Sequence, residues 1–251
     1  MTGIVYKSTG SWYTVKTPNG KFYECRIKGK FRIQGIKSTN PIAVGDVVEF
    51  DIETKNNTAT GVIKRIEERK NYIVRKSVNL SKQTHIIASN VHQVFLLVTI
   101  NNPPTFTSFI DRFLVTAEAY SINTVILFNK IDVYDEETIL EVKYLASIYR
   151  KIGYECIGIS ATTGTNIDKV KELMLGKISM FAGHSGVGKS TLVNAIEPSL
   201  DLKTKEISNQ HMQGQHTTTF AEMFDLSFDA QIIDTPGIKG FGVVDMEKEE
   251  V

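Results

Sequence analysis

Hydrophobic and polar positions alternate along the first 70 residues in the pattern of short β-strands. The stretches concerned are rich in aromatic and β-branched residues, and they are residues 3–16, 22–27, 28–34, 44–52 and 61–66. Pro18-Asn19-Gly20 between the first two is a hairpin-turn sequence. Short strands separated by turns over such a length predict an all-β barrel of the OB-fold type for residues 1–70.

After residue 70 the pattern changes. Residues 71–90 are predicted to be a polar linker, and beyond them continuous apolar runs alternate with amphipathic segments. The predicted strands, apolar enough to be buried on both faces, are 94–100, 124–128, 156–159, 177–182 and 231–233. The predicted helices are 107–120, 136–151, 166–174 with Asn166 as N-cap, and one starting near residue 191. Residues 91–251 are therefore predicted to form an α/β domain with a mostly parallel sheet, helices on both faces and ligands at the carboxyl ends of the strands.

Composition narrows the class of protein. The chain has 251 residues, of which 41% are hydrophobic and 23% charged, as in soluble globular proteins. No apolar run approaches the roughly 20 residues of a membrane span, and the N-terminus has no signal-peptide pattern. Cys25 and Cys156 are isolated, as expected of ordinary thiols in a reducing compartment. We expect a cytoplasmic protein with no membrane partner.

The net charge of +1 conceals an uneven distribution. Residues 1–82 hold 16 Lys and Arg against 7 Asp and Glu, whereas residues 83–251 hold 13 against 21. A basic N-terminal part predicts contact with a polyanion, although solvated surface lysines would give the same count. Aromatic residues of the predicted barrel would either stack on bases or fill the barrel, and they are Trp12, Tyr13, Phe22, Tyr23 and Phe31.

Residues 183–190 read G-H-S-G-V-G-K-S and match the phosphate-binding loop G-x-x-x-x-G-K-[ST] at every position. Such glycines let backbone N–H groups surround phosphate oxygens, and the following helix adds its partial positive charge. We expect Lys189 to contact the β- and γ-phosphates and Ser190 to bind Mg²⁺. The predicted phosphate-binding residues of this loop are Gly183, His184, Ser185, Gly186, Val187, Gly188, Lys189, Ser190 and Thr191.

Two motifs that follow predicted strands point to guanine. The first is N-K-I-D at residues 129–132, in which the Asp132 carboxylate would accept the N1–H and N2–H of guanine, a pattern that adenine does not offer. We expect Asn129 to tie neighbouring loops together and the stem of Lys130 to lie against the base. The second is Ser160-Ala161, where the Ala161 N–H would donate to the guanine O6. Ordinary turns carry such residues too, so the motifs gain their weight from the phosphate loop in the same chain.

Residues 234–237 read D-T-P-G and fit the motif D-x-x-G. Asp234 would hold Mg²⁺ through water, and the Gly237 N–H would contact the γ-phosphate. Residues 214–219, G-Q-H-T-T-T, lie between the two phosphate motifs, where a switch loop that completes Mg²⁺ coordination belongs. The base-reading motifs precede the phosphate loop, the reverse of the usual order. This order predicts a circularly permuted GTPase domain.

With these motifs and I-D-R-F-L at 110–114, the chain resembles the circularly permuted, ribosome small-subunit-dependent GTPase family called RsgA or YjeQ. The resemblance covers almost the whole chain, from the barrel through residues 234–237. It implies an OB-fold followed by a permuted GTPase domain, and a factor in late maturation of the small (30S) ribosomal subunit. It also implies binding of GTP or GDP with Mg²⁺, contact with rRNA, and hydrolysis stimulated by the subunit. We expect a monomer.

The resemblance assigns roles to two switch residues. Thr218 would bind Mg²⁺, and His216 would join Lys189 as a catalytic residue by orienting the attacking water. The family lacks the glutamine that many GTPases carry after D-x-x-G, and here Ile238 follows Gly237, so intrinsic hydrolysis is expected to be slow. Histidine can orient or deprotonate water near neutral pH. The alternative is that His216 only packs or contacts RNA.

Family members usually continue into a C-terminal domain with a zinc site of cysteines and a histidine. The sequence through Val251 holds no such cluster, so we expect no zinc and a chain that stops short of that domain. Three other functions fit the same motifs: a permuted GTPase of the large subunit, a nucleotide-gated RNA-binding module with negligible turnover, and an ATPase. The basic barrel argues against the first of these.

Overall fold

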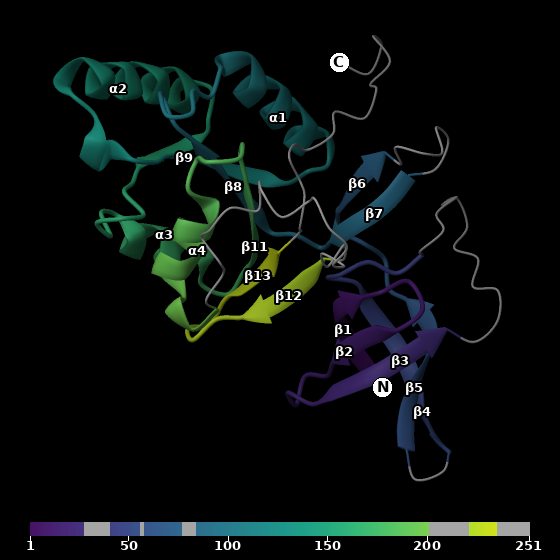
Figure 1. The fold of residues 1–251 in the computed structure, drawn as a ribbon. Coiled ribbons are helices and arrows are strands. Elements are labelled where there is room, and N and C mark those ends of the chain that lie inside the picture. Colours follow the sequence, from purple (N-terminus) through teal and green to yellow (C-terminus); the bar gives the residue numbers. More distant parts are fainter. Residues whose placement is uncertain (28–40, 56–57, 77–83, 201–220, 235–251) are drawn as a thin grey trace, which may run out of the picture.

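The computed structural model describes residues 1–27, 41–55, 58–76, 84–200 and 221–234. Within these ranges a barrel and a helix-covered sheet lie side by side (Figure 1). One ladder of paired strands runs through both, in the order β10-β9-β8-β11-β13-β12-β1-β2-β3-β5-β4. The two units therefore meet where β12 pairs with β1.

The barrel consists of β1 (Thr2–Ser8), β2 (Tyr13–Lys16), β3 (Phe22–Ile27), β4 (Val47–Lys55) and β5 (Thr58–Ile66). β1 pairs with both β2 and β4, which closes the barrel, and β3 pairs in parallel with β5. Side chains that alternate along the strands fill the interior, and they include Val5, Tyr13, Val15, Cys25, Val48, Phe50 and Ile63. The predicted barrel of the OB type is confirmed.

The barrel aromatics divide between the two roles left open by the sequence. Tyr13 is 1% exposed and fills the barrel. Tyr23 is partly buried and packs against the same core. Trp12 and Phe22 are 46% and 53% exposed and remain available on the surface. Phe31 lies outside the described residues.

The second unit contains the parallel strands β8 (Gln93–Val98), β9 (Asn123–Phe128), β10 (Glu155–Gly158), β11 (Ile178–Ala182) and β13 (Gln231–Asp234), with β12 (Glu222–Asp225) antiparallel to β13. The helices are α1 (Thr107–Ala119), α2 (Glu136–Lys151), α3 (Ile167–Met174) and α4 (Lys189–Ile196), and the short turns are η1 (Ile131–Val133) and η2 (Pro198–Leu200). None of the helices in the described part of the chain is both long and apolar enough to cross a membrane.

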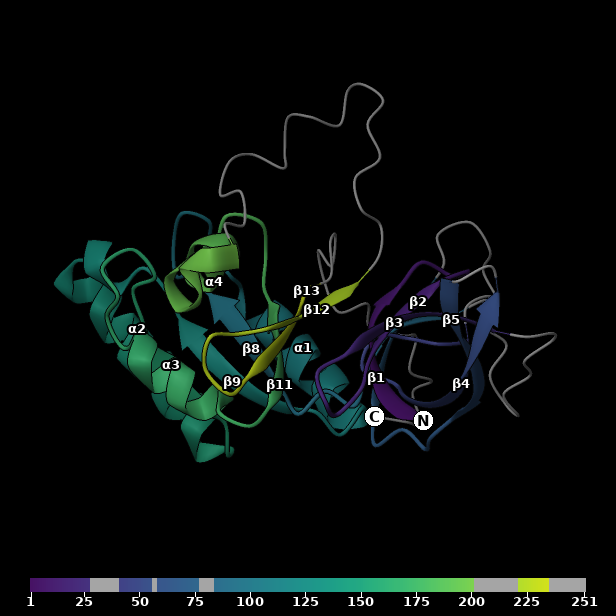
Figure 2. The same cartoon turned by 90° about the horizontal axis from the view of Figure 1, so that it is seen from below.

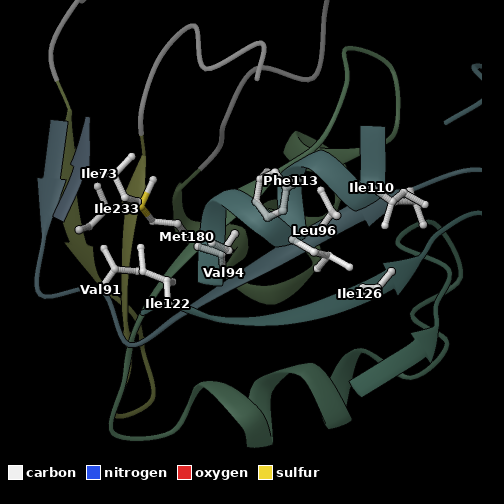
Figure 3. Packing of buried hydrophobic residues seen from close by; sticks show 14 of the residues in the cluster. Ile73, Val91, Val94, Leu96, Ile110, Phe113, Ile122, Ile126, Met180 and Ile233 are labelled. Carbon is white, nitrogen blue, oxygen red and sulfur yellow. The ribbon is translucent and has the colours of Figure 1, made fainter. Parts of the chain in front are cut away.

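Alternate residues of the central strands enter two cores. Val94 and Leu96 of β8 pack with Phe113 and other residues of α1 and α2 on one face (Figure 3). Phe95 and Leu97 pack with residues of α3 and α4 on the other. The predicted parallel sheet with helices on both faces is confirmed, because burial on both sides is what continuous apolar strands require.

Within residues 71–90, expected to be a linker, β6 (Tyr72–Lys76) and β7 (Thr84–Ser89) pair as antiparallel strands. Ile73 of β6 packs in the same core as Met180 and Ile233 (Figure 3). Strands this short carry too few alternating positions to stand out in a polar sequence. The division of the chain at residues 70 and 90 stays a prediction.

The sequence predicts Asn166 as the N-cap of α3. It occupies the N-cap position with φ 59° but makes no side-chain cap hydrogen bond. Its Nδ2 instead donates to the Gly158 carbonyl at 2.7 Å. The predicted N-cap position is confirmed, and the side chain ties the start of α3 to the end of β10.

Candidate nucleotide-binding site

The predicted phosphate loop connects β11 to α4 and depends on its glycines. Gly183, Gly186 and Gly188 have φ values of 140°, 85° and 101°. A Cβ on Gly183 would stand 2.5 Å from the Leu97 carbonyl oxygen, and one on Gly188 would stand 2.4 Å from Asn129 Nδ2. Glycine is needed at both positions for the backbone conformation and for the close approach of neighbouring loops.

Lys189 begins α4, and its ammonium turns back over the loop. Its Nζ donates to the carbonyls of Gly183 at 2.6 Å and of His184 at 2.7 Å. Burial lowers the pKa of Lys189. A partly buried cation beside a helix N-terminus is well suited to a phosphate group.

The remaining loop residues differ in environment. Val187 is fully buried in the core beneath α3 and α4, whereas Ser185 is exposed. The His184 ring lies 3.8 Å from the Phe109 ring of α1, at 36°. Burial, and then the charge of Lys189, lowers the pKa of His184, so this side chain is neutral at pH 7.

Asn129, which follows β9, is 2% exposed and connects three segments. Its Nδ2 donates to the Val187 carbonyl of the phosphate loop at 2.8 Å, and its Oδ1 accepts from the Ala161 N–H at 3.1 Å. The expectation that Asn129 ties neighbouring loops together is confirmed. The predicted base-reading and phosphate-binding loops are thus fastened to each other at the carboxyl edge of the sheet.

Lys130 makes a second link between the same loops. Its backbone is left-handed, with φ 69°, and its Nζ donates to the Gly186 carbonyl at 2.9 Å and to the Asn102 carbonyl. Burial lowers the pKa of Lys130, against an opposing effect of Asp132. Asp132 lies in η1 with its side chain exposed to solvent.

The Ser160-Ala161 loop is held by hydrogen bonds within the protein. Ser160 is fully buried, and its Oγ accepts from the Thr163 N–H at 3.0 Å. The Ala161 N–H, predicted to donate to a guanine O6, donates to Asn129 in this structure. A base at this position would have to share that N–H with the asparagine or displace it.

Tyr134 supports the site although no motif contains it. Its hydroxyl donates to the Asn129 carbonyl at 2.9 Å and accepts from the Ile100 N–H at 3.0 Å, which joins the loops after β8 and β9. Burial raises the pKa of Tyr134, so the hydroxyl remains a donor at neutral pH. A single tyrosine near a motif carries no sequence signal of this role.

The predicted metal ligands lie at the same edge. Ser190 is the second residue of α4, and Asp234 is the last residue of β13, which pairs in parallel with β11. Hydroxyl and carboxylate oxygens are the ligands that Mg²⁺ prefers, so these residue types fit. No group of three or more His, Cys, Asp and Glu that could hold a metal ion occurs in the ranges that the structure describes. Thr218, His216 and Gly237 lie outside those ranges.

Comparison with known proteins places both units in one family. The family model described as RsgA N-terminal domain matches residues 2–63, and that described as RsgA GTPase matches residues 66–244. Two proteins named Small ribosomal subunit biogenesis GTPase RsgA match over all 251 residues. The one from Christiangramia forsetii is 75% identical, with 80% of its length covered, and the one from Flavobacterium johnsoniae is 70% identical, with 77% covered.

Solved structures agree with this assignment. YjeQ from Thermotoga maritima superposes with a TM-score of 0.76 at 37% identity, over 99% of this chain and 79% of that one. YloQ, described as a circularly permuted GTPase, gives a TM-score of 0.71 at 29% identity, over 99% and 75% of the two chains. Because the barrel, the permuted order of motifs and the matches along the sequence all coincide, this chain belongs to the RsgA GTPase family.

Proposed function

We propose that this chain is a GTP hydrolase that acts in the biogenesis of the small ribosomal subunit. The observation that carries the proposal is the pair of links made by Asn129 and Lys130 between the N-K-x-D loop and the phosphate loop. These links bring a base-reading motif and a phosphate motif to one edge of the sheet in a chain 75% identical to a protein named for this role.

Each end of the nucleotide has its own set of residues in this proposal. At the base, the exposed Asp132 carboxylate accepts the guanine N1–H and N2–H, and the stem of Lys130 lies against the ring. At the phosphates, Lys189 uses two of its three N–H donors on loop carbonyls, which leaves one for a phosphate oxygen. Backbone N–H groups of the loop and the α4 N-terminus add electrostatic stabilisation of the transferring phosphoryl group.

Ser190, Thr218 and, through water, Asp234 would hold Mg²⁺, which when bound neutralises charge on the phosphates. The Gly237 N–H would contact the γ-phosphate. His216 would orient the attacking water once the small subunit positions the segment that carries it. Because Ile238 cannot orient water, hydrolysis by the chain alone is expected to be slow.

The barrel would contact rRNA. Its support is the excess of Lys and Arg over residues 1–82 together with the exposed rings of Trp12 and Phe22. RNA binding is expected to weaken steeply with salt, because cations that neutralise phosphates release counterions. We expect a monomer acting in the cytoplasm.

The test measures multiple-turnover phosphate release with GTP or ATP, with and without purified small or large subunits. The expected result is slow GTP hydrolysis that is accelerated by small subunits and not by large subunits, with little ATP hydrolysis. No turnover with small subunits would leave a nucleotide-gated RNA-binding module, and equal use of ATP would favour an ATPase. His216→Ala should lose the stimulated rate, and an unchanged rate would remove the histidine from the mechanism.

Asp132 gives a sharper test of base recognition. Asp132→Ala should abolish the preference for GTP over ATP. Asp132→Asn should bind xanthosine triphosphate instead, because xanthine carries an oxygen where guanine carries the N2 amino group, and an asparagine amide can donate to it. Retained guanine preference in both variants would contradict the assignment of Asp132.

A further inference from the structure

Strand β12 lies between β13 and the barrel in both views (Figures 1 and 2). Glu222 of β12 stands opposite Asp234 of β13 on one side and opposite Lys7 of β1 on the other. A row of three residues across three strands therefore leads from the barrel to the predicted metal residue Asp234. By sequence, the β12–β13 hairpin also joins the predicted switch residues 214–219 to the D-x-x-G motif.

Two carboxylates of β12 bind three barrel side chains. Lys7 Nζ lies 3.0 Å from Glu222 Oε2. From the barrel, the Tyr6 hydroxyl donates to Asp225 Oδ1 at 2.7 Å and Lys16 Nζ donates to Oδ2 at 2.5 Å. From β13, Gln231 Nε2 also donates to Oδ1, at 3.4 Å. Both oxygens of one carboxylate are thus engaged from the barrel side, which fixes β12 in position and in orientation.

The barrel side of this contact is itself ordered by aromatic packing. Tyr6 is 7% exposed, and its ring meets the Phe22 ring edge-on, with centroids 5.4 Å apart at 86°. Lys16 Nζ lies 5.2 Å from the Tyr6 centroid and 5.6 Å from that of Phe22, within reach of cation–π attraction. Burial, and then Asp225, raises the pKa of Tyr6, so the hydroxyl stays protonated and continues to donate.

We infer that Tyr6, Lys7 and Lys16 are positioning residues for the metal side of the nucleotide site, acting through β12 on Asp234. The inference rests on the proposed function. Its physical basis is that β12 is the only strand paired with β13 on that side in the described part of the sheet, so a shift of β12 moves the end of β13. A ligand that shifts the barrel would therefore change the affinity for Mg²⁺–nucleotide at Asp234. By thermodynamic linkage, Mg²⁺–nucleotide would change the affinity for that ligand by the same factor.

The experiment measures the dissociation rate of a fluorescent GDP analogue from the full chain over a range of free Mg²⁺ concentrations. The test variant combines Tyr6→Phe and Lys16→Met, which removes the two hydrogen bonds that the barrel donates to Asp225 and keeps the ring and the aliphatic stem. Arg26→Met is the matched control, because Arg26 pairs with Glu53, 3.4 Å away on the barrel surface, and these residues lie on β3 and β4, which do not pair with β12. A far-UV spectrum and a melting curve confirm that each variant folds.

We expect the test variant to need about fivefold or more free Mg²⁺ to slow GDP release, a shift in the usual range of coupling between sites. Release in excess chelator should match wild type, and the control should behave as wild type throughout. Exchanging the charges, with Lys16→Asp and Asp225→Lys together, should restore part of the Mg²⁺ dependence that Lys16→Asp alone removes.

Unaltered Mg²⁺ dependence in the Tyr6→Phe, Lys16→Met variant would overturn this inference and leave the proposed function standing. A wild-type chain that bound no guanine nucleotide would overturn the proposed function, and the inference with it. An equal loss of GDP affinity with and without Mg²⁺ would show a general structural defect and would also contradict the positioning role.

Discussion

Two regions of the molecule hold neighbouring segments together by different means. We call the loops that follow β9, β10 and β11 the nucleotide edge, and the contact of β12 with the barrel the joint. At the nucleotide edge, Asn129 is 2% exposed and makes neutral hydrogen bonds to two loops. At the joint, the side chains of Lys16 and Asp225 are 25% and 37% exposed and form an ion pair.

This difference has energetic consequences. A buried polar group left without a partner costs about 1–3 kcal/mol, whereas an exposed ion pair contributes about 0–1 kcal/mol and is screened by salt. The loops that would read the base and phosphates are therefore fixed in advance. The ion pairs of the joint cost less to rearrange than these buried hydrogen bonds. In our proposal, nucleotide recognition and coupling to the barrel therefore belong to separate parts of the molecule.

The largest expected effect follows from Lys189 at the nucleotide edge. Lys189→Ala should lower the subunit-stimulated hydrolysis rate about 100- to 1,000-fold, the usual result of removing one electrostatic contact to the reacting group. Its melting temperature should stay near that of wild type, because the variant also removes a partly desolvated ammonium. Single-turnover GTP hydrolysis and thermal unfolding measure the two quantities, with the exposed Lys151→Ala as control. A rate within threefold of wild type would contradict the role of Lys189.

The second largest effect is expected from removing the buried hydrogen bonds of Asn129. Asn129→Ala leaves the Val187 carbonyl and the Ala161 N–H without their partner, and at about 1–3 kcal/mol for each group this should weaken GDP binding by roughly 30-fold or more. The melting temperature should fall as well. Titration with a fluorescent GDP analogue and thermal unfolding test this, against Asn123→Ala at the exposed start of the same strand. Equal affinity in the two variants would show that the loops hold their places without Asn129.

The sequence predicts those parts of the nucleotide edge whose residues are close together along the chain. The phosphate loop and N-K-x-D are short runs with fixed chemistry, so the pattern located Asn129, Lys130 and Lys189. Apolar runs that are buried on both faces likewise located the central strands. The sequence alone could not pair the Ala161 N–H with Asn129 rather than with a base, because that choice depends on loop positions set by tertiary packing.

The joint was beyond prediction for a different reason. Tyr6 and Asp225 are 219 positions apart, and their contact exists only because β12 pairs with β1. β12 itself was not predicted, since its four residues are too few to show a period. Tyr134 was missed likewise, because its partners Ile100 and Asn129 meet it only in the folded sheet.

Glu197 offers an intermediate case, a buried carboxylate with neutral partners. It ends α4 and is 4% exposed, and it accepts from the Ser199 hydroxyl at 2.6 Å and the Ser227 N–H at 2.7 Å. These hydrogen bonds lower the pKa of Glu197 from 4.5 to about 2. Its stabilisation is therefore complete above pH 4.5 and is lost as the pH falls through about 2.

Glu197→Gln should consequently lower the free energy of unfolding by about 1–2 kcal/mol at pH 7, with a smaller difference from wild type as the pH approaches 2. Urea unfolding at a series of pH values measures this, and Glu155→Gln on an exposed strand position is the control. A difference that stayed constant down to pH 2 would mean that the charge of Glu197 does not contribute.

The smallest expected effect is that of salt, which should weaken the ion pairs of the joint and leave the neutral hydrogen bonds of the nucleotide edge unchanged. Raising the salt from about 0.05 to 0.5 M shortens the screening length from over 10 Å to a few ångströms, which should weaken the exposed pairs of Lys7 and Lys16. The Mg²⁺ requirement for slow GDP release should then rise about twofold in wild type. The Tyr6→Phe, Lys16→Met variant keeps only the Lys7–Glu222 ion pair of the joint, so its Mg²⁺ requirement should rise less than that of wild type. Salt also screens Mg²⁺ itself, but this affects wild type and variant alike, so only the difference between their Mg²⁺ requirements reports on the joint. If the Mg²⁺ requirement rose equally with salt in both proteins, the barrel would not position Asp234.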